Sequence, residues 1–234
     1  MNITPKQVIT LAAKYIGYKE KASNKDLYSF EGNAGKGNYT MFQEELAKAG
    51  FWNNNKQGYE WCTSFVAWCF WRLCGNVEAK QILCLTGDYG ASCVSWAKYY
   101  AAQARLFTKP QVGDQFFQRD SRDGLPCHTG IVESVNGNTF VTIEGNAGNA
   151  VKRVTRTLNN TVYGFGRPKY TAESEDEEMV RWNKIEDVPE GFYRDTVRQL
   201  MHDGIIKGKG NGVIDLTEDM LRVMIFCQRI IGKA

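Results

Sequence analysis

The segment from Cys62 to Gly75 limits the possible folds of this 234-residue chain more than any other part of it. Its side chains are apolar on nearly every side of a helix, and a glycine provides the end. A helix without a polar face is stable in water only where other elements surround it. We therefore predict a helix buried at the centre of a domain. Its longest apolar run, Phe65 to Trp71, is far short of the roughly 20 residues that cross a membrane, so no membrane span is predicted.

The segments around this helix indicate an α+β fold. Capping boxes at Thr4 to Gln7 and at Thr40 to Gln43 begin two further helices, and a fourth helix covers Val94 to Gln103. After Pro110 the sequence becomes strand-like, in the segments 112–117, 128–135, 139–144 and 151–154. Helices that precede a run of neighbouring strands predict helices packed on an antiparallel sheet.

A polar, acidic run at residues 171–178 divides the chain. Residues 1–170 carry 20 Lys and Arg against 13 Asp and Glu, whereas residues 171–234 carry 9 against 13. Because composition and the sign of the charge change together there, we predict a large domain over 1–170, an acidic linker over 171–179 and a small helical domain over 180–234. The alternative is that the acidic run is the solvated first turn of a helix.

The cysteine and histidine content restricts the chemistry. The seven cysteines are an odd number and contain no C-x-x-C pair, which indicates a reduced protein without a disulfide framework or a zinc site. The chain has two histidines, and His202 falls on a predicted helix of the small domain. His128, at the start of a strand, is then the one candidate base in the large domain.

Cys62 stands at the first turn of the buried helix. A thiol in this position is stabilised as a thiolate by the unpaired N–H groups and by the helix dipole. A thiolate nucleophile also needs an imidazole, and a third group that orients the imidazole. The pattern therefore predicts Cys62 as the nucleophile and His128 as its partner.

The hairpin between the second and third strands suggests which residue orients the imidazole of His128. A three-residue loop, Asn136 to Asn138, would place Asn146 opposite His128 and Glu144 one diagonal away on the same face. A two-residue loop would turn Glu144 to the other face, so the prediction depends on the register. The alternative is that Glu144 is an ordinary charge at the end of a strand and that His128 is a structural histidine.

Four motifs occur in one order along the large domain: Tyr59-Glu-Trp-Cys-Thr-Ser-Phe-Val-Ala-Trp-Cys69, Val112-Gly-Asp114, Cys127-His-Thr-Gly-Ile-Val132 and Thr142-Ile-Glu-Gly-Asn146. Together they resemble the CHAP domain, the cysteine/histidine amidohydrolase/peptidase relative of NlpC-type and papain-like folds. The flanking segments 17–23 and 164–170 look like the edges of this domain in endolysins of phages that infect Gram-positive bacteria. The resemblance covers about residues 1–170 and implies a papain-like or NlpC-like fold.

The resemblance also implies roles for single residues. Cys62 would be the nucleophile, His128 the base and Glu144 the residue that orients it, with Asn146 completing the polar site. The implied substrate is an amide bond of peptidoglycan, either the N-acetylmuramoyl-L-alanine amide or a bond within the peptide.

The residues just before the nucleophile are candidates for contact with the substrate. The backbone N–H of Cys62 is the expected oxyanion donor, with Gln57 or Tyr59 as a possible side-chain donor, and Trp61 as a substrate contact. Most other aromatic residues are predicted to pack in the core. Residues 53–60 hold one acidic residue among amides, too few hard anionic ligands for calcium, so no metal and no cofactor is predicted.

The small domain is predicted to contain two helices. The first covers Phe192 to Met201, a glycine-rich segment at 207–212 reads as a turn, and Thr217 caps a second helix to Ile231. The order of motifs at 186–189, 203–208 and 215–218 resembles one S-layer homology repeat, but Thr217-Glu-Asp-Met220 stands where that family has Thr-Arg-Ala-Glu. The resemblance implies binding of a wall glycopolymer, and self-association is the alternative.

We therefore expect a cell-wall lytic enzyme, an endolysin, whose partner is peptidoglycan rather than nucleic acid. The first residues do not read as a signal peptide, so we expect the protein in the host cytoplasm and its release to the wall through a membrane opening made by a holin. Two alternatives from other classes remain: a non-catalytic wall-binding or assembly module, and a thiol amidase that acts on a substrate outside the wall.

Overall fold

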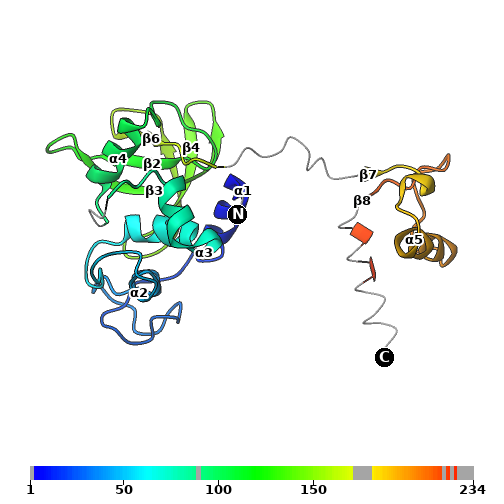
Figure 1. The fold of residues 1–234 in the computed structure, drawn as a ribbon, viewed down its shortest axis with the longest axis horizontal. Coiled ribbons are helices and arrows are strands. Elements are labelled where there is room, and N and C mark those ends of the chain that lie inside the picture. Colours follow the sequence, from blue (N-terminus) through cyan, green and yellow to red (C-terminus); the bar gives the residue numbers. More distant parts are fainter. Residues whose placement is uncertain (1–2, 88–90, 171–180, 218–219, 222–223, 226–234) are drawn as a thin grey trace. The chain divides into compact units, whose positions relative to one another are not determined.

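The computed structural model describes residues 3–87, 91–170, 181–217, 220–221 and 224–225. The chain divides into two compact units, residues 1–171 and residues 172–234, which are described separately below (Figure 1). The predicted linker at 171–179 lies outside the described residues. In the described part of the chain, no helix has the length and hydrophobicity of a membrane span.

The first unit begins with four helices: α1 (Pro5–Ala13), α2 (Met41–Lys48), α3 (Cys62–Ile82) and α4 (Cys93–Ala102). The predicted capping box of α1 is confirmed, because Thr4 Oγ1 accepts from the Gln7 N–H and Gln7 Oε1 accepts from the Thr4 N–H. The predicted end at Gly75 is a break within α3, where Gly75 has a φ of 81° and the helix resumes as far as Ile82.

The sheet has six strands, all antiparallel, in the order β1-β6-β2-β3-β4-β5. The strands are β1 (Leu106–Phe107), β2 (Gln115–Arg119), β3 (Pro126–Asn136), β4 (Thr139–Glu144), β5 (Lys152–Thr157) and β6 (Val162–Gly166). Figure 1 shows α1, α3 and α4 beside this sheet, so the predicted packing of helices on an antiparallel sheet is confirmed.

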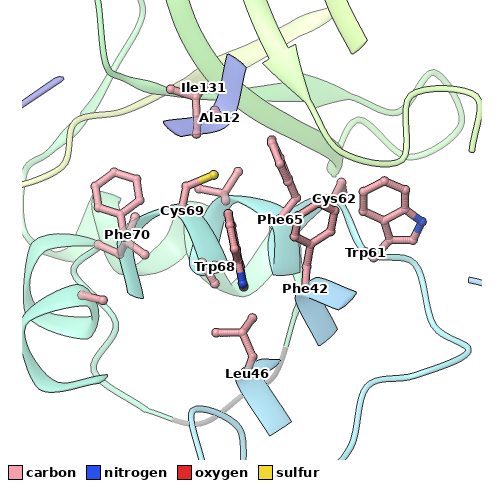
Figure 2. Packing of buried hydrophobic residues seen from close by; sticks show 14 of the residues in the cluster. Ala12, Phe42, Leu46, Trp61, Cys62, Phe65, Trp68, Cys69, Phe70 and Ile131 are labelled. Atoms are coloured by element: carbon pink, nitrogen blue, oxygen red, sulfur yellow. The ribbon is translucent and has the colours of Figure 1, made fainter. Parts of the chain in front are cut away.

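The buried helix predicted from the sequence is confirmed, since every residue of α3 from Cys62 to Phe70 is buried. Figure 2 shows α3 between the sheet, represented by Ile131, and the α2 side chains Phe42 and Leu46. The Phe42 ring lies edge-on to Trp68, with 5.1 Å between the ring centroids. Burial of side chains of this size contributes about 1.5–3 kcal/mol each, so α3 is fixed firmly in the domain centre.

The β3–β4 hairpin differs from the predicted one. Asn136 pairs with Thr139, so the loop has two residues and not three. A β-bulge at Glu133 then shifts the register by one residue, and Ile131 pairs with Ile143 beyond it. The bulge restores the register that the three-residue loop would have given. Glu144 therefore still points to the face of β3 that carries His128.

The second unit contains α5 (Phe192–His202), a short 3-10 helix (Ile185–Asp187), and two short antiparallel strands, β7 (Arg181–Trp182) and β8 (Leu216–Thr217). Its core residues are Trp182, Val188, Val197, Leu200, Ile206, Ile214, Leu216 and Leu221. The predicted first helix is confirmed, whereas the strand pair was not predicted. Most of the predicted second helix lies outside the described residues, but Thr217 Oγ1 accepts from the Met220 N–H as the predicted cap requires.

Candidate active site

Cys62 is the first residue of α3, and 6% of its surface is exposed. No side chain caps this end of the helix, so its first N–H groups are not taken by a capping oxygen. The N–H of Thr63 donates to the Cys62 sulfur. These features are those that favour a thiolate at a helix N-terminus.

A glycine after β4 lets α3 approach the sheet closely. A Cβ atom added at Gly145 would lie 2.4 Å from Phe65 Cβ and 2.9 Å from Trp61 Cζ3, distances that real contacts do not reach. The first turn of α3 therefore packs directly against the end of β4. This contact brings Cys62 to the His128 ring, and the imidazole there favours the ionised form of the thiol.

His128 lies near the start of β3 and is held by Glu144 from β4. His128 Nε2 is 2.9 Å from Glu144 Oε2. The ring then has Nδ1 left to face the thiol, which gives the order thiol, imidazole, carboxylate. The three residues that the sequence predicted as nucleophile, base and orienting group are therefore brought together.

Gly130 provides the space that Glu144 needs to reach the imidazole. A Cβ atom at Gly130 would lie 2.5 Å from Glu144 Cγ and 2.8 Å from the Ile143 carbonyl oxygen. Neither atom is the far end of a flexible side chain, so an alanine would push the carboxylate out of place. The glycine is thus part of the geometry that holds His128.

We expect Gly130→Ala to lower the catalytic rate by about 10- to 100-fold, since a displacement near 1 Å in an orienting group has effects of this order. Clearing of purified cell walls, the activity predicted from the sequence, measures the rate. Gly137→Asn, at the tip of the same hairpin, is the control, because nothing lies within 4 Å of the added Cβ and asparagine tolerates the φ of 57° there; its rate should stay within about twofold of wild type. A Gly130→Ala protein as active as this control would contradict the role given to Gly130.

Arg156, on β5, is a member of the site that the sequence did not reveal. Its Nε lies 2.5 Å from Glu144 Oε1, and its second guanidinium nitrogen lies 2.8 Å from Glu144 Oε2. The Thr142 hydroxyl also donates to Glu144 Oε1. The guanidinium in turn lies over the Phe116 ring, 4.5 Å from its centroid. Glu144 is fully buried, and a buried carboxylate needs such partners to remain charged.

The contacts determine the charges of the site. A hydrogen bond from Cys93, together with His128, holds the pKa of Cys62 well below its usual range despite burial. Burial alone would lower the pKa of His128, but its hydrogen bonds to Cys62 and Glu144 raise it to about 9. Burial would raise the pKa of Glu144, but Arg156 and His128 lower it to about 2. These shifts favour a thiolate at Cys62, an imidazolium at His128 and a carboxylate at Glu144.

We expect the rate of the amide hydrolysis predicted from the sequence to fall on the alkaline side with a midpoint near pH 9. Above the pKa of about 9, His128 loses the proton that the leaving amine requires. Glu144→Gln removes one of the contacts that raise this pKa, so its midpoint should move to lower pH. Initial rates of wall digestion between pH 5 and 10.5 measure both. An unchanged midpoint in Glu144→Gln would contradict the assignment.

Several residues predicted to touch the substrate are used elsewhere. Trp61 is fully buried, its Nε1 donates to Glu20 Oε2 at 2.7 Å, and its ring stacks on Phe42, which corrects the prediction of a substrate contact. Gln57 uses both ends of its amide on the backbone of Thr40, at 2.9 and 2.8 Å, so it is not a free oxyanion donor.

Two predicted residues remain: Tyr59, a predicted substrate contact, is exposed, and Asn146, predicted to complete the polar site, is half-buried. Tyr59 is 67% exposed and remains a candidate for substrate binding. Asn146 does not pair with His128 as predicted, because β4 ends at Glu144 and Asn146 lies in the turn beyond it with a φ of 60°. Its amide donates instead to Glu60 in the loop before the nucleophile. Among the described residues, no group of three or more His, Cys, Asp or Glu is placed to hold a metal ion.

The sequence of residues 53–146 matches the family model of the CHAP domain. A comparison with curated proteins found no match to the chain. Among solved structures, Ly7917 aligns with 71% of this chain and 62% of its own at 15% identity, with a TM-score of 0.43. The structure of Ly7917 with the hydrolyzing product of MDP aligns with 70% of this chain and 63% of its own at 14% identity, with a TM-score of 0.42. A Staphylococcus aureus subsp. aureus Mu50 protein, described as similar to a lipoprotein of the NLP/P60 family, aligns with 73% of this chain and 44% of its own. The identity is 12% and the TM-score is 0.35.

The chain therefore covers less than two thirds of each of these solved proteins. The family match is shorter than the first unit, but it contains Cys62, His128 and Glu144. The helices on an antiparallel sheet agree with the papain-like, NlpC-like α+β class that the sequence predicted. The segment that carries all three side chains of the candidate site, residues 53–146, is a match to the CHAP domain family.

Proposed function

We propose that the first unit hydrolyses an amide bond of bacterial peptidoglycan, with Cys62 as the nucleophile. The observation that carries this proposal is the chain of contacts from the Cys62 thiol through His128 to Glu144, within a segment that matches the CHAP domain. A thiol at a helix N-terminus, an imidazole and an orienting carboxylate together form the arrangement required for acyl transfer by a cysteine.

The reaction proceeds in two steps. The Cys62 thiolate attacks the amide carbonyl carbon, and the N–H of Cys62 at the helix N-terminus stabilises the negative oxygen of the tetrahedral intermediate. His128 then donates its proton to the amine, the C–N bond breaks, and a thioester remains on Cys62. In the second step His128 takes a proton from water, and the hydroxide formed attacks the thioester carbon. The C–S bond then breaks, which releases the product as a carboxylate and restores the Cys62 thiolate.

Charge supports a substrate in the cell wall. Residues 1–170 carry 20 Lys and Arg against 13 Asp and Glu, and a basic domain is drawn to an anionic wall. The second unit has its own hydrophobic core, and in this proposal it keeps the enzyme at the wall, by binding a wall glycopolymer or by self-association. The protein acts in this proposal as a phage endolysin that leaves the host cytoplasm through a holin-made opening.

Digestion of purified peptidoglycan followed by mass spectrometry of the soluble fragments tests the proposal. A muramoyl-L-alanine amidase releases peptides with a new L-alanine amino terminus and leaves a free lactyl carboxylate on the glycan. An endopeptidase leaves the stem attached and creates a new amine within the peptide or its cross-bridge. Either product supports the proposed function. A folded protein that releases neither at high enzyme concentration would refute it.

A further inference from the structure

Two helices begin at the same point in the domain. Cys62 is the first residue of α3 and Cys93 is the first residue of α4, and their sulfur atoms are 3.9 Å apart. The two residues are 31 positions apart in the sequence, and both are buried, with 6% and 7% of their surface exposed. The proposed hydrolysis uses only Cys62 as its nucleophile, and Cys93 forms no bond to the substrate in it.

The separation of the two sulfurs is compatible with bond formation. A disulfide requires about 2.05 Å between sulfurs, so the two sulfur atoms, 3.9 Å apart, must approach by roughly 1.9 Å to bond. A third thiol, Cys127, is exposed, and its sulfur lies 3.7 Å from the Gln118 carbonyl oxygen. Cys127 is therefore the natural competitor for Cys62 and must be tested with Cys93.

The surroundings give the two thiols different reactivity. His128 contacts Cys62, and the hydrogen bond between the two cysteines lowers the pKa of Cys62 and raises that of Cys93, which burial raises further. Thiolates and not thiols react with peroxides. Cys62 is thus the thiol that an oxidant attacks first, and Cys93 is the neighbouring thiol that then reacts with the oxidised Cys62.

We propose that Cys62 and Cys93 form a reversible disulfide when the protein meets hydrogen peroxide. The Cys62 thiolate attacks one oxygen of the peroxide, the S–O bond forms, the O–O bond breaks, and hydroxide leaves. Cys93 then attacks the sulfur of the sulfenic acid, the S–S bond forms and the S–O bond breaks. The Cys93 proton leaves with the hydroxide as water. In total, the two thiols lose two electrons and peroxide is reduced to water.

The disulfide regulates the proposed active site, so this part of the proposal rests on the proposed function. While it is present, Cys62 carries no thiolate and cannot attack an amide. A thiol reductant exchanges with the disulfide and restores the nucleophile. Without a neighbouring thiol, a sulfenic acid continues to the sulfinic acid, which thiols do not reduce. Cys93 therefore protects the nucleophile and makes its oxidation reversible.

The test oxidises the full-length protein with a small excess of hydrogen peroxide after reduction and desalting. Free thiols are then blocked with iodoacetamide, and peptides from a digest without reductant are analysed by mass spectrometry. We expect a linked pair of peptides that contain Cys62 and Cys93. Wall digestion should fall at least about tenfold and return after treatment with dithiothreitol.

Variants distinguish this disulfide from other oxidation products. The activity of each variant after oxidation is compared with the activity of the same variant before peroxide is added. Cys93→Ser and Cys93→Ala should be inactivated without recovery and should contain Cys62 sulfinic acid, while Cys127→Ser should recover like wild type. Linkage of Cys62 to Cys127, or recovery in both Cys93 variants, would overturn the proposal, as would sulfinic acid without a disulfide in the wild type. Because the linked peptides are detected without any measurement of hydrolysis, their absence is distinct from a failure of the proposed function.

Discussion

Cys62→Ala is expected to lower the rate of peptidoglycan hydrolysis by about three orders of magnitude or more, the scale observed when an enzyme loses its nucleophile. The other members of the site, His128 and Glu144, remain in the variant, but they have no atom that can form the acyl intermediate. Binding to the wall does not require the thiol, so the variant should still sediment with purified walls. Release of soluble fragments and sedimentation measure the two properties separately.

Cys69→Ala is the matched control for this experiment. Cys69 lies on the same helix two turns further along and is fully buried, and its pKa is raised by burial with no imidazole as partner. Its loss leaves a small cavity, so a modest decrease in stability is expected, whereas hydrolysis should stay within about threefold of wild type. A Cys62→Ala protein that retained more than a tenth of the wild-type rate would exclude Cys62 as the nucleophile.

The central helix and its reactive cysteine were predictable because they depend on local rules. An apolar helix must be buried, and a cysteine at its start meets the free N–H groups there. The capping box at Thr4 was predictable for the same reason, since its donors and acceptors lie within one turn. Features that the chain encodes within a few residues are open to sequence reasoning.

The position of Glu144 was predicted correctly for a wrong reason. The predicted position depended on a three-residue loop, while the structure has a two-residue loop and a bulge at Glu133. A third loop residue and a β-bulge each shift the pairing of β3 with β4 by one residue. Either of them therefore places Glu144 on the face of the sheet that carries His128. Bulges depend on packing across the whole sheet, and a hairpin sequence alone does not reveal them.

Trp61 and Arg156 show where sequence reasoning fails. Trp61 follows a loop and precedes the nucleophile, which suggested exposure, but its ring is covered by Phe42 and its indole N–H is bound by Glu20, 41 residues away. Arg156 reaches Glu144 because β5 pairs with β4 along its whole length, from Thr139 to Glu144. Both contacts join residues that are distant in sequence, and no local pattern marks them.

Arg156→Met is expected to destabilise the first unit by about 3 kcal/mol, because it removes the bidentate partner of a buried carboxylate. Glu144 is fully buried and keeps only His128 and Thr142 as partners in the variant. Arg153→Met is the matched control on the same strand. Arg153 makes a similar bidentate pair with Glu133, at 2.5 and 2.7 Å, but its side chain is half exposed, so its loss should cost less than about 1 kcal/mol. Guanidinium unfolding followed by tryptophan fluorescence measures both.

The pH dependence of stability distinguishes the electrostatic role of Arg156 from simple packing. The pKa of Glu144 is about 2 in the folded protein and 4.5 for the free side chain, so its contribution to stability is complete above pH 4.5 and is lost as the pH falls toward 2. Without Arg156 the folded pKa moves up toward the unfolded one. The difference in unfolding free energy between wild type and Arg156→Met should therefore shrink between pH 6 and pH 3. A difference that stayed constant over this range would mean that the arginine acts through its packing on Phe116 and not through the charge of Glu144.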